Sequence, residues 1–204
     1  DTLLDEIDCL EIINDPTYPD APQANDKAVR FLDELWNDGH KIIGVGGSDS
    51  HNLIDERYEG ATLPSVAGDP GTYVFCDKLT PAHLMENVKE GHVCVTRFIQ
   101  VEPHIMSGEK EYLPGEDLGE ASEIIYHALI RDVEEKPLVY MIKNGSKTKL
   151  SVEQKPDGTY EIQECIALEH GKWQWIRLEI RTQAGELLGY VNPVYQGKKE
   201  PEYT

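Results

Sequence analysis

The pattern of apolar residues changes near residue 105, and this change limits the folds open to the chain. Before it, strand-like apolar runs alternate with helix-like segments; the runs lie at 7–13, 41–45, 72–76 and 92–96. One helix is expected between a cap at Asn25 or Asp26 and Gly39, and a second between Thr80 and Gly91. This order, β-α-β-loop-β-α-β, predicts a parallel sheet or barrel.

Beyond residue 105 the helical period disappears and short strand-like runs follow one another, separated by turn pairs such as Asn144-Gly145 and Asp157-Gly158. The runs lie at 124–130, 138–143, 160–166, 173–181 and 187–191. Strands at this spacing predict a small antiparallel β-sandwich. We therefore predict an α/β domain at residues 1–106 and an all-β domain at residues 107–204.

The net charge of −19 over 204 residues is the one extreme total of the composition. It disfavours nucleic-acid polymers and anionic membranes as partners, because both would be repelled at long range. An acidic surface suits a cation-binding protein, but it equally serves solubility. No apolar run approaches the roughly 18 residues of a membrane-spanning helix.

The four cysteines are far apart, and Cys9, Cys76 and Cys94 sit in or beside strand-like runs. We interpret these three as small buried side chains, and the lack of a Cys-x-x-Cys pair favours a reducing, cytoplasmic compartment. The chain starts at Asp1 without a methionine and runs directly into a strand. We therefore expect a fragment of a longer protein.

Residues 44–51, Gly-Val-Gly-Gly-Ser-Asp-Ser-His, follow the expected strand at 41–45. In an extended segment Asp49 and His51 point to the same side, so both can reach one metal ion at about 2.0–2.2 Å. Gly46 and Gly47 would let the backbone approach a metal or substrate closely. Taken alone, Asp49 could equally be a turn or capping residue and His51 a solvated side chain.

This stretch and its surroundings resemble the polymerase and histidinol phosphatase (PHP) superfamily over almost the whole chain. GVGGSDSH resembles the last metal-binding motif of that family and is the most specific mark. Residues 8–14 (DCLEIIN) resemble an earlier strand of the family, and the stretches at 70–74 and 84–91 are also similar. In one branch a β-sandwich follows the barrel, and its marks here are the stretches at 113–117, 175–179 and 190–195.

The resemblance implies a metal-dependent phosphoesterase with a partial (β/α)7-type barrel at residues 1–106 and a β-sandwich at 107–204. It implies that Asp49 and His51 are catalytic metal ligands in a site for two or three divalent ions, commonly Zn, Mn or Fe. Such ions polarise a phosphoryl oxygen and lower the pKa of a bridging water toward about 7. The partner would be a small phosphorylated substrate, either a phosphomonoester or a diester.

The opening His-x-His motif of the family does not occur in this chain. The remaining histidines are interpreted as surface or hydrogen-bonded side chains: His40, His83, His92, His104, His127 and His170. Two ligands are fewer than the three of a catalytic zinc site. We therefore expect the C-terminal portion of an enzyme, inactive alone, that associates with itself or with the upstream half of the same parent chain.

Three further residues could line the site. Glu11 and Asn14 could orient a ligand or contact substrate, or could simply be a strand-end residue and a turn residue. Arg57 lies in the long loop 52–71 and could meet a phosphate, although loop arginines are usually solvated.

Two other functions remain open. In a non-catalytic binding module the sandwich would recognise a glycan or a protein through Trp173, Trp175 and Tyr190, although such aromatic residues are commonly core residues. In a pseudoenzyme the same fold would bind no metal.

Overall fold

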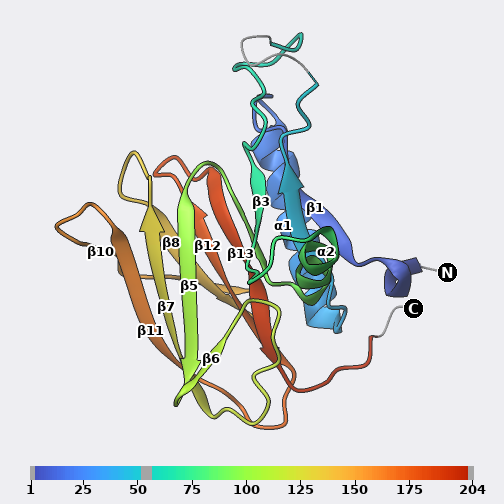
Figure 1. The fold of residues 1–204 in the computed structure, drawn as a ribbon, viewed down its shortest axis with the longest axis vertical. Helices are drawn as coiled ribbons and strands as arrows, with labels where there is room; N and C mark the ends of the chain where they lie inside the picture. The colour runs from blue at the N-terminus through green and yellow to red at the C-terminus, as the bar shows by residue number, and fades with distance from the viewer. Residues whose placement is uncertain (1–2, 52–56, 202–204) are drawn as a thin grey trace.

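The computed structural model describes residues 3–51 and 57–201. Two antiparallel sheets stack face to face, and a smaller parallel pair of strands and two helices lie beside them (Figure 1). The five-stranded sheet has the order β10-β11-β7-β5-β6, and the six-stranded sheet has the order β3-β4-β13-β12-β8-β9.

The elements before the predicted boundary are a 3-10 turn η1 (Leu3–Glu6), β1 (Cys9–Asn14), α1 (Ala21–Asp38), β2 (Ile43–Gly47), β3 (Gly71–Val74), α2 (Pro81–Glu90) and β4 (Val93–Thr96). Those that cross or follow it are β5 (Gln100–Ser107), β6 (Lys110–Tyr112), β7 (Glu123–Arg131), β8 (Leu138–Lys143), β9 (Ser146–Lys149), β10 (Glu153–Gln154), β11 (Tyr160–Ala167), β12 (Gln174–Arg181) and β13 (Leu187–Gln196).

The expected partial (β/α)7-type barrel is wrong for the described part of the chain. In that part only β1 and β2 pair in parallel, whereas β3 and β4 are antiparallel to each other and β4 is antiparallel to β13. The sequence pattern predicts β3-α2-β4 to be a parallel crossover, whose helix would cover a sheet face. Helix α2 has no buried residue, so it does not cover a sheet face as such a helix would. The fold is mainly antiparallel β.

The strands on the two sides of residue 106/107 share sheets. Both β3 and β4 extend the six-stranded sheet next to β13, and β5 pairs with β7 in the five-stranded sheet. The predicted strands beyond residue 107 are all present, and four further strands were missed: β5, β6, β9 and β10.

Two apolar cores hold the layers together. The first lies between the two sheets and includes Ile105, Tyr126 and Leu178. The second lies between the outer face of the six-stranded sheet and the α1-β1-β2 unit, and it includes Ile12, Trp36 and Trp175. Strand β12 is therefore buried on both faces.

The helix ends show which capping signals operate. Helix α2 has the predicted ends, with the Thr80 hydroxyl accepting a hydrogen bond from the His83 N–H at 3.3 Å and Gly91 at φ 82°. Helix α1 ends at Gly39 as predicted, at φ 105°, but it begins at Ala21 and not near Asn25. The buried Asn25 side chain instead accepts from Asn14 N–H at 3.1 Å.

The cysteine interpretation is confirmed only for Cys94, which is buried. Cys9 and Cys76 are half-buried, and Cys165 is exposed. Across the described ranges, no helix combines the length and the apolar character that crossing a bilayer requires.

Candidate functional site

Asp49 and His51 lie just past the carboxyl end of β2. Both side chains are exposed, with 56% of the Asp49 and 73% of the His51 side-chain surface accessible. Asp49 has a left-handed backbone conformation at φ 50°, which turns the chain at this point. Asp49 Oδ1 and His51 Nδ1 are 3.7 Å apart, so the two side chains share one small region of space.

The histidine ring is oriented by the backbone. Its Nδ1 lies 2.8 Å from the Asp49 carbonyl oxygen. Because a carbonyl can only accept, Nδ1 carries a proton here, and in the neutral imidazole Nε2 then keeps its lone pair. Metal-binding histidines commonly show this arrangement, in which one ring nitrogen donates to a carbonyl and the other binds the ion.

Tyr58 fastens the turn that carries both residues. Its hydroxyl accepts from the His51 N–H at 2.5 Å and donates to the Asp49 carbonyl at 3.3 Å. The Tyr58 ring stacks on Tyr18 with 6.3 Å between ring centroids. Sequence reasoning missed this role, because a loop tyrosine seven residues after His51 has no distinguishing pattern.

Glu11 and Asn14 lie at the same edge, since carboxyl ends of parallel strands meet there. Asn14 is in register with Gly47, and a Cβ on Gly47 would lie 3.5 Å from Glu11 Oε1. The Asn14 side-chain amide donates to Glu11 Oε2 at 2.9 Å. Glu11 and Asn14 therefore lie beside the carboxyl end of β2, which leads directly into the turn at Asp49.

A cavity of about 250 Å³ opens next to Asp49. Its lining includes three carboxylates and two amides: Asp15, Asp20, Asp49, Asn14 and Asn25. Neither His51 nor Glu11 lines it. Within the described ranges, no three His, Cys, Asp or Glu side chains are placed to hold a metal ion together. The donor set fits two positions of a metal site and does not complete one.

Arg57 is exposed, and among the described residues it forms no hydrogen bond or ion pair with Asp49 or His51. The rest of the loop up to residue 56 lies outside the described residues.

The glycines of the motif meet protein side chains. A Cβ on Gly46 would lie 2.5 Å from Val95 Cγ1, and one on Gly44 would lie 2.9 Å from Ile12 Cδ1. The expectation that Gly46 makes room for a metal or substrate is therefore wrong. Gly46 lacks a side chain because β4 packs against it.

Side chains from distant strands hold β2 in place. The buried Asn192 amide donates to the carbonyls of Gly44 and Val93, and its Oδ1 accepts from Gly44 N–H at 2.8 Å. The Thr72 hydroxyl accepts from Gly46 N–H at 2.9 Å and donates to its carbonyl at 2.8 Å. The strand that leads to Asp49 is thereby tied to β3, β4 and β13.

The aromatic residues proposed for a binding module lie mostly inside the protein. Trp175 and Tyr190 are fully buried in the second core. Trp173 is half-buried and stacks on Trp36 at 6.1 Å. No exposed aromatic platform is formed by these three side chains.

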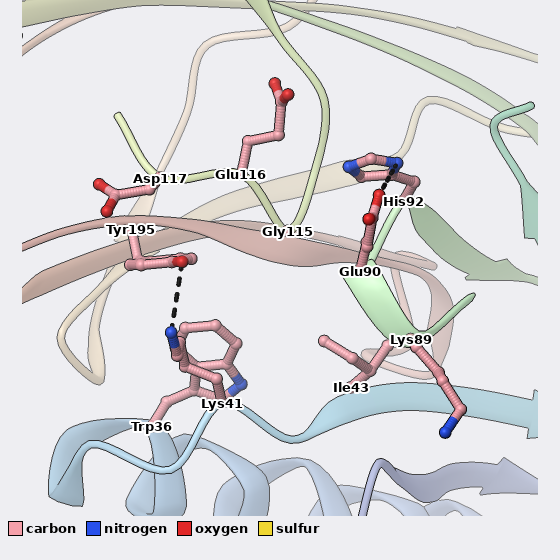
Figure 2. Close-up of a pocket in the computed structure, with 10 residues that line it drawn as sticks. All are labelled: Trp36, Lys41, Ile43, Lys89, Glu90, His92, Gly115, Glu116, Asp117 and Tyr195. Carbon is pink, nitrogen blue, oxygen red and sulfur yellow. Dashed lines mark hydrogen bonds and ion pairs between the residues drawn. The ribbon is translucent and has the colours of Figure 1, made fainter. Parts of the chain in front are cut away.

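A larger cavity of about 430 Å³ lies at the opposite, amino end of β2 (Figure 2). Its charged groups already have partners: Lys41 Nζ contacts the Tyr195 hydroxyl at 3.3 Å, and Lys89 contacts Asp8 at 2.7 Å. Figure 2 also shows Glu90 directed at His92, with 3.6 Å between the charged atoms. Because these interactions occupy the polar groups, this cavity is a weaker candidate than the turn at Asp49.

No family model matches the chain, and none of the curated proteins is significantly similar to it.

Proposed function

We propose that this chain contributes Asp49 and His51 as two metal ligands of a metal-dependent phosphoesterase site. The observation that carries the proposal is the arrangement at the end of β2, where the Asp49 carboxylate lies beside a histidine ring whose Nδ1 is held by a carbonyl. The resemblance of residues 44–51 to the last metal motif of PHP phosphoesterases supports it.

Within this proposal, Asp49 binds the ion through its carboxylate and His51 binds it through Nε2. A bound divalent ion would polarise a phosphoryl oxygen and supply an activated water. Tyr58 holds the turn and so fixes the spacing of the two ligands, while Glu11 and Asn14 present polar groups at the neighbouring strand end. Further ligands would come from outside the described residues or from another chain.

The first test measures metal binding by isothermal titration with MnCl2 or ZnCl2. We expect Asp49→Ala and His51→Ala each to weaken binding at this site at least about tenfold, which is about 1.4 kcal/mol. Asp132→Ala is a matched control, because Asp132 is also exposed and has a similar backbone φ of 59°. Equal affinity in all four proteins would refute the ligand assignment.

The second test measures hydrolysis of p-nitrophenyl phosphate in the presence of Mn2+. Asp49→Ala should lower the turnover at least about 100-fold, or about 3 kcal/mol of transition-state stabilisation. Unchanged turnover would exclude the proposed role. The non-catalytic alternative, favoured by the absence of a third ligand among the described residues, predicts neither bound transition metal nor activity in the unsubstituted protein.

A further inference from the structure

A pair of histidines lies on the outer face of the five-stranded sheet, far from Asp49 in the chain. His104 on β5 and His127 on β7 are directly opposite each other in the antiparallel register. Their neighbours Ile105 and Tyr126 point into the core between the sheets, so both imidazoles point outward. The ring centroids are 5.7 Å apart.

Each ring is held by its own glutamate. His104 Nδ1 lies 2.8 Å from Glu111 Oε1, and His127 Nε2 lies 2.7 Å from Glu161 Oε1. With neutral imidazoles and ionised carboxylates, the nitrogen facing each glutamate carries the proton. His104 Nε2 and His127 Nδ1 then keep their lone pairs, and neither has a hydrogen-bond partner among the described residues.

This pattern has the chemistry of a metal-binding pair. Histidine ligands usually donate their second ring N–H to a carboxylate, which fixes the tautomer and raises the basicity of the ligating nitrogen. The side chains are partly open to water, at 45% exposure for His104 and 24% for His127, so an ion could retain coordinated water. Glu111 and Glu161 bring two carboxylates to the pair, and Lys155 also contacts Glu161.

We propose that His104 and His127 together bind one divalent transition-metal ion, with water completing its coordination. Imidazole nitrogen is a preferred ligand for Ni2+, Cu2+ and Zn2+, and affinities generally rise from Ni2+ to Cu2+ and fall again at Zn2+. No third metal-binding side chain converges on the pair within the described ranges. The protein therefore supplies two ligands to the ion, and among these three ions Cu2+ is expected to bind most tightly.

The competing explanation is two independent ion pairs between protonated histidine and glutamate. The chain provides matched controls for it, because His83 lies 3.4 Å from Asp77 and His170 lies 3.0 Å from Glu120. Each of these is a histidine beside a carboxylate without an opposing histidine in register. Substitutions of His83 and His170 therefore show how much metal affinity a single histidine-carboxylate contact contributes, in comparison with the histidine pair.

The experiment titrates the whole chain with NiCl2 and CuCl2 by calorimetry at neutral pH, and records electron paramagnetic resonance spectra with less than one equivalent of Cu2+. All proteins carry Asp49→Ala, His51→Ala and Cys165→Ser, which remove the other proposed site and the exposed thiol. We expect His104→Gln and His127→Gln each to raise the Kd of the tightest site at least tenfold and to reduce two nitrogen ligands to one. His83→Gln and His170→Gln should leave both readouts unchanged.

The proposal would be overturned if either His104→Gln or His127→Gln kept the Kd of the tightest site unchanged. It would also be overturned if the Cu2+ spectrum of the protein with both histidines showed a single nitrogen ligand. Circular dichroism of each variant verifies folding. Should His104→Gln fail to fold, the conservative variant His104→Asn and the nitrogen count in the parent spectrum decide the question.

Discussion

At the scale of single residues, the glycines of residues 44–47 have distinct roles. Gly46 lies where Val95 packs, whereas Gly47 has Glu11 Oε1 as its nearest neighbour, at 3.5 Å from an added Cβ. Neither Gly46 nor Gly47 has a positive φ, so any residue could adopt the backbone conformation of Gly46. A larger residue is excluded there because Val95 occupies the space of its side chain. A methyl group at residue 46 would have to move Val95 or the strand itself.

We predict that Gly46→Ala lowers the free energy of unfolding by about 2 kcal/mol, because added volume in a packed contact forces neighbouring atoms to shift. Gly47→Ala, one residue further on the same strand, should change it by less than about 1 kcal/mol. Urea denaturation of both variants measures the difference. Equal effects would mean that the contact with Val95 is not limiting.

Sequence reasoning located part of the candidate site. The Asp-x-His spacing after a strand pointed to Asp49 and His51, and a strand glutamate followed three residues later by an asparagine pointed to Glu11 and Asn14. The roles of Tyr58 and Asn192 could not be predicted. Asn192 bonds to Gly44 from 148 residues away, and nothing local to either residue indicates that contact.

At the scale of elements, ion pairs fasten helix α1 to strand β12. Arg177 is almost fully buried and binds the Asp33 carboxylate through two nitrogens at 2.7 and 2.8 Å. Glu179 accepts from Arg177 at 3.0 Å and from Arg181 at 2.5 Å, and it also contacts Lys147. Burial alone would raise the pKa of Glu179, but the charges of Arg177 and Arg181 outweigh it and lower this pKa to about 2.

This pKa predicts a loss of stability in acid. Because the folded-state value lies below the unfolded value of about 4.3, Glu179 contributes about 3 kcal/mol above pH 5, and about 2 kcal/mol of this is lost by pH 3. The remainder disappears as the pH falls through 2. Glu179→Gln should remove this part of the pH dependence and lower stability at pH 7 by about 3 kcal/mol.

Urea denaturation of wild type and Glu179→Gln at pH 7 and pH 3 measures both effects. Glu153→Gln is the control, because Glu153 is exposed on β10. If wild type and Glu179→Gln lost the same stability between pH 7 and pH 3, the assignment to Glu179 would be wrong.

Most helices and strands could be predicted from periodicity and capping residues, but the strands with which each strand pairs and the elements that pack against it could not. A short apolar run such as 92–96 fits either a parallel or an antiparallel buried strand. The local sequence of β12 does not show that α1 covers the face on which Arg177 binds Asp33. Long-range pairing decides both cases, and it leaves little trace in a local pattern.

At the scale of the whole molecule, each of the two large sheets contains strands from before and after the predicted boundary at residue 106/107. A fragment of residues 107–204 would lack β3, β4 and nearly all of β5, which lies between β7 and β6. It would also expose Trp175 and Tyr190, which the α1-β1-β2 unit covers. The loss of an interior strand leaves unpaired edges on β7 and β6 and an open core.

We predict that the fragment 107–204 neither unfolds cooperatively nor gives a dispersed amide spectrum, whereas the whole chain does both. Thermal denaturation and two-dimensional NMR of the two proteins compare them directly. A fragment of residues 71–204, which keeps every strand of the two large sheets, is the control and should retain more ordered structure. Cooperative unfolding of 107–204 would instead support a domain boundary at 106/107.

Strand β13 is the last strand that the structure describes, and it lies between β4 and β12 in the six-stranded sheet. During synthesis on the ribosome, β13 is therefore made about 90 residues after β4, with which it pairs, at about 5–20 residues per second. Until then the edge of β4 and the buried side of α1 lack their final neighbours. The six-stranded sheet therefore cannot be completed before β13 has left the ribosome, and a nascent chain stalled before residue 187 should bind chaperones.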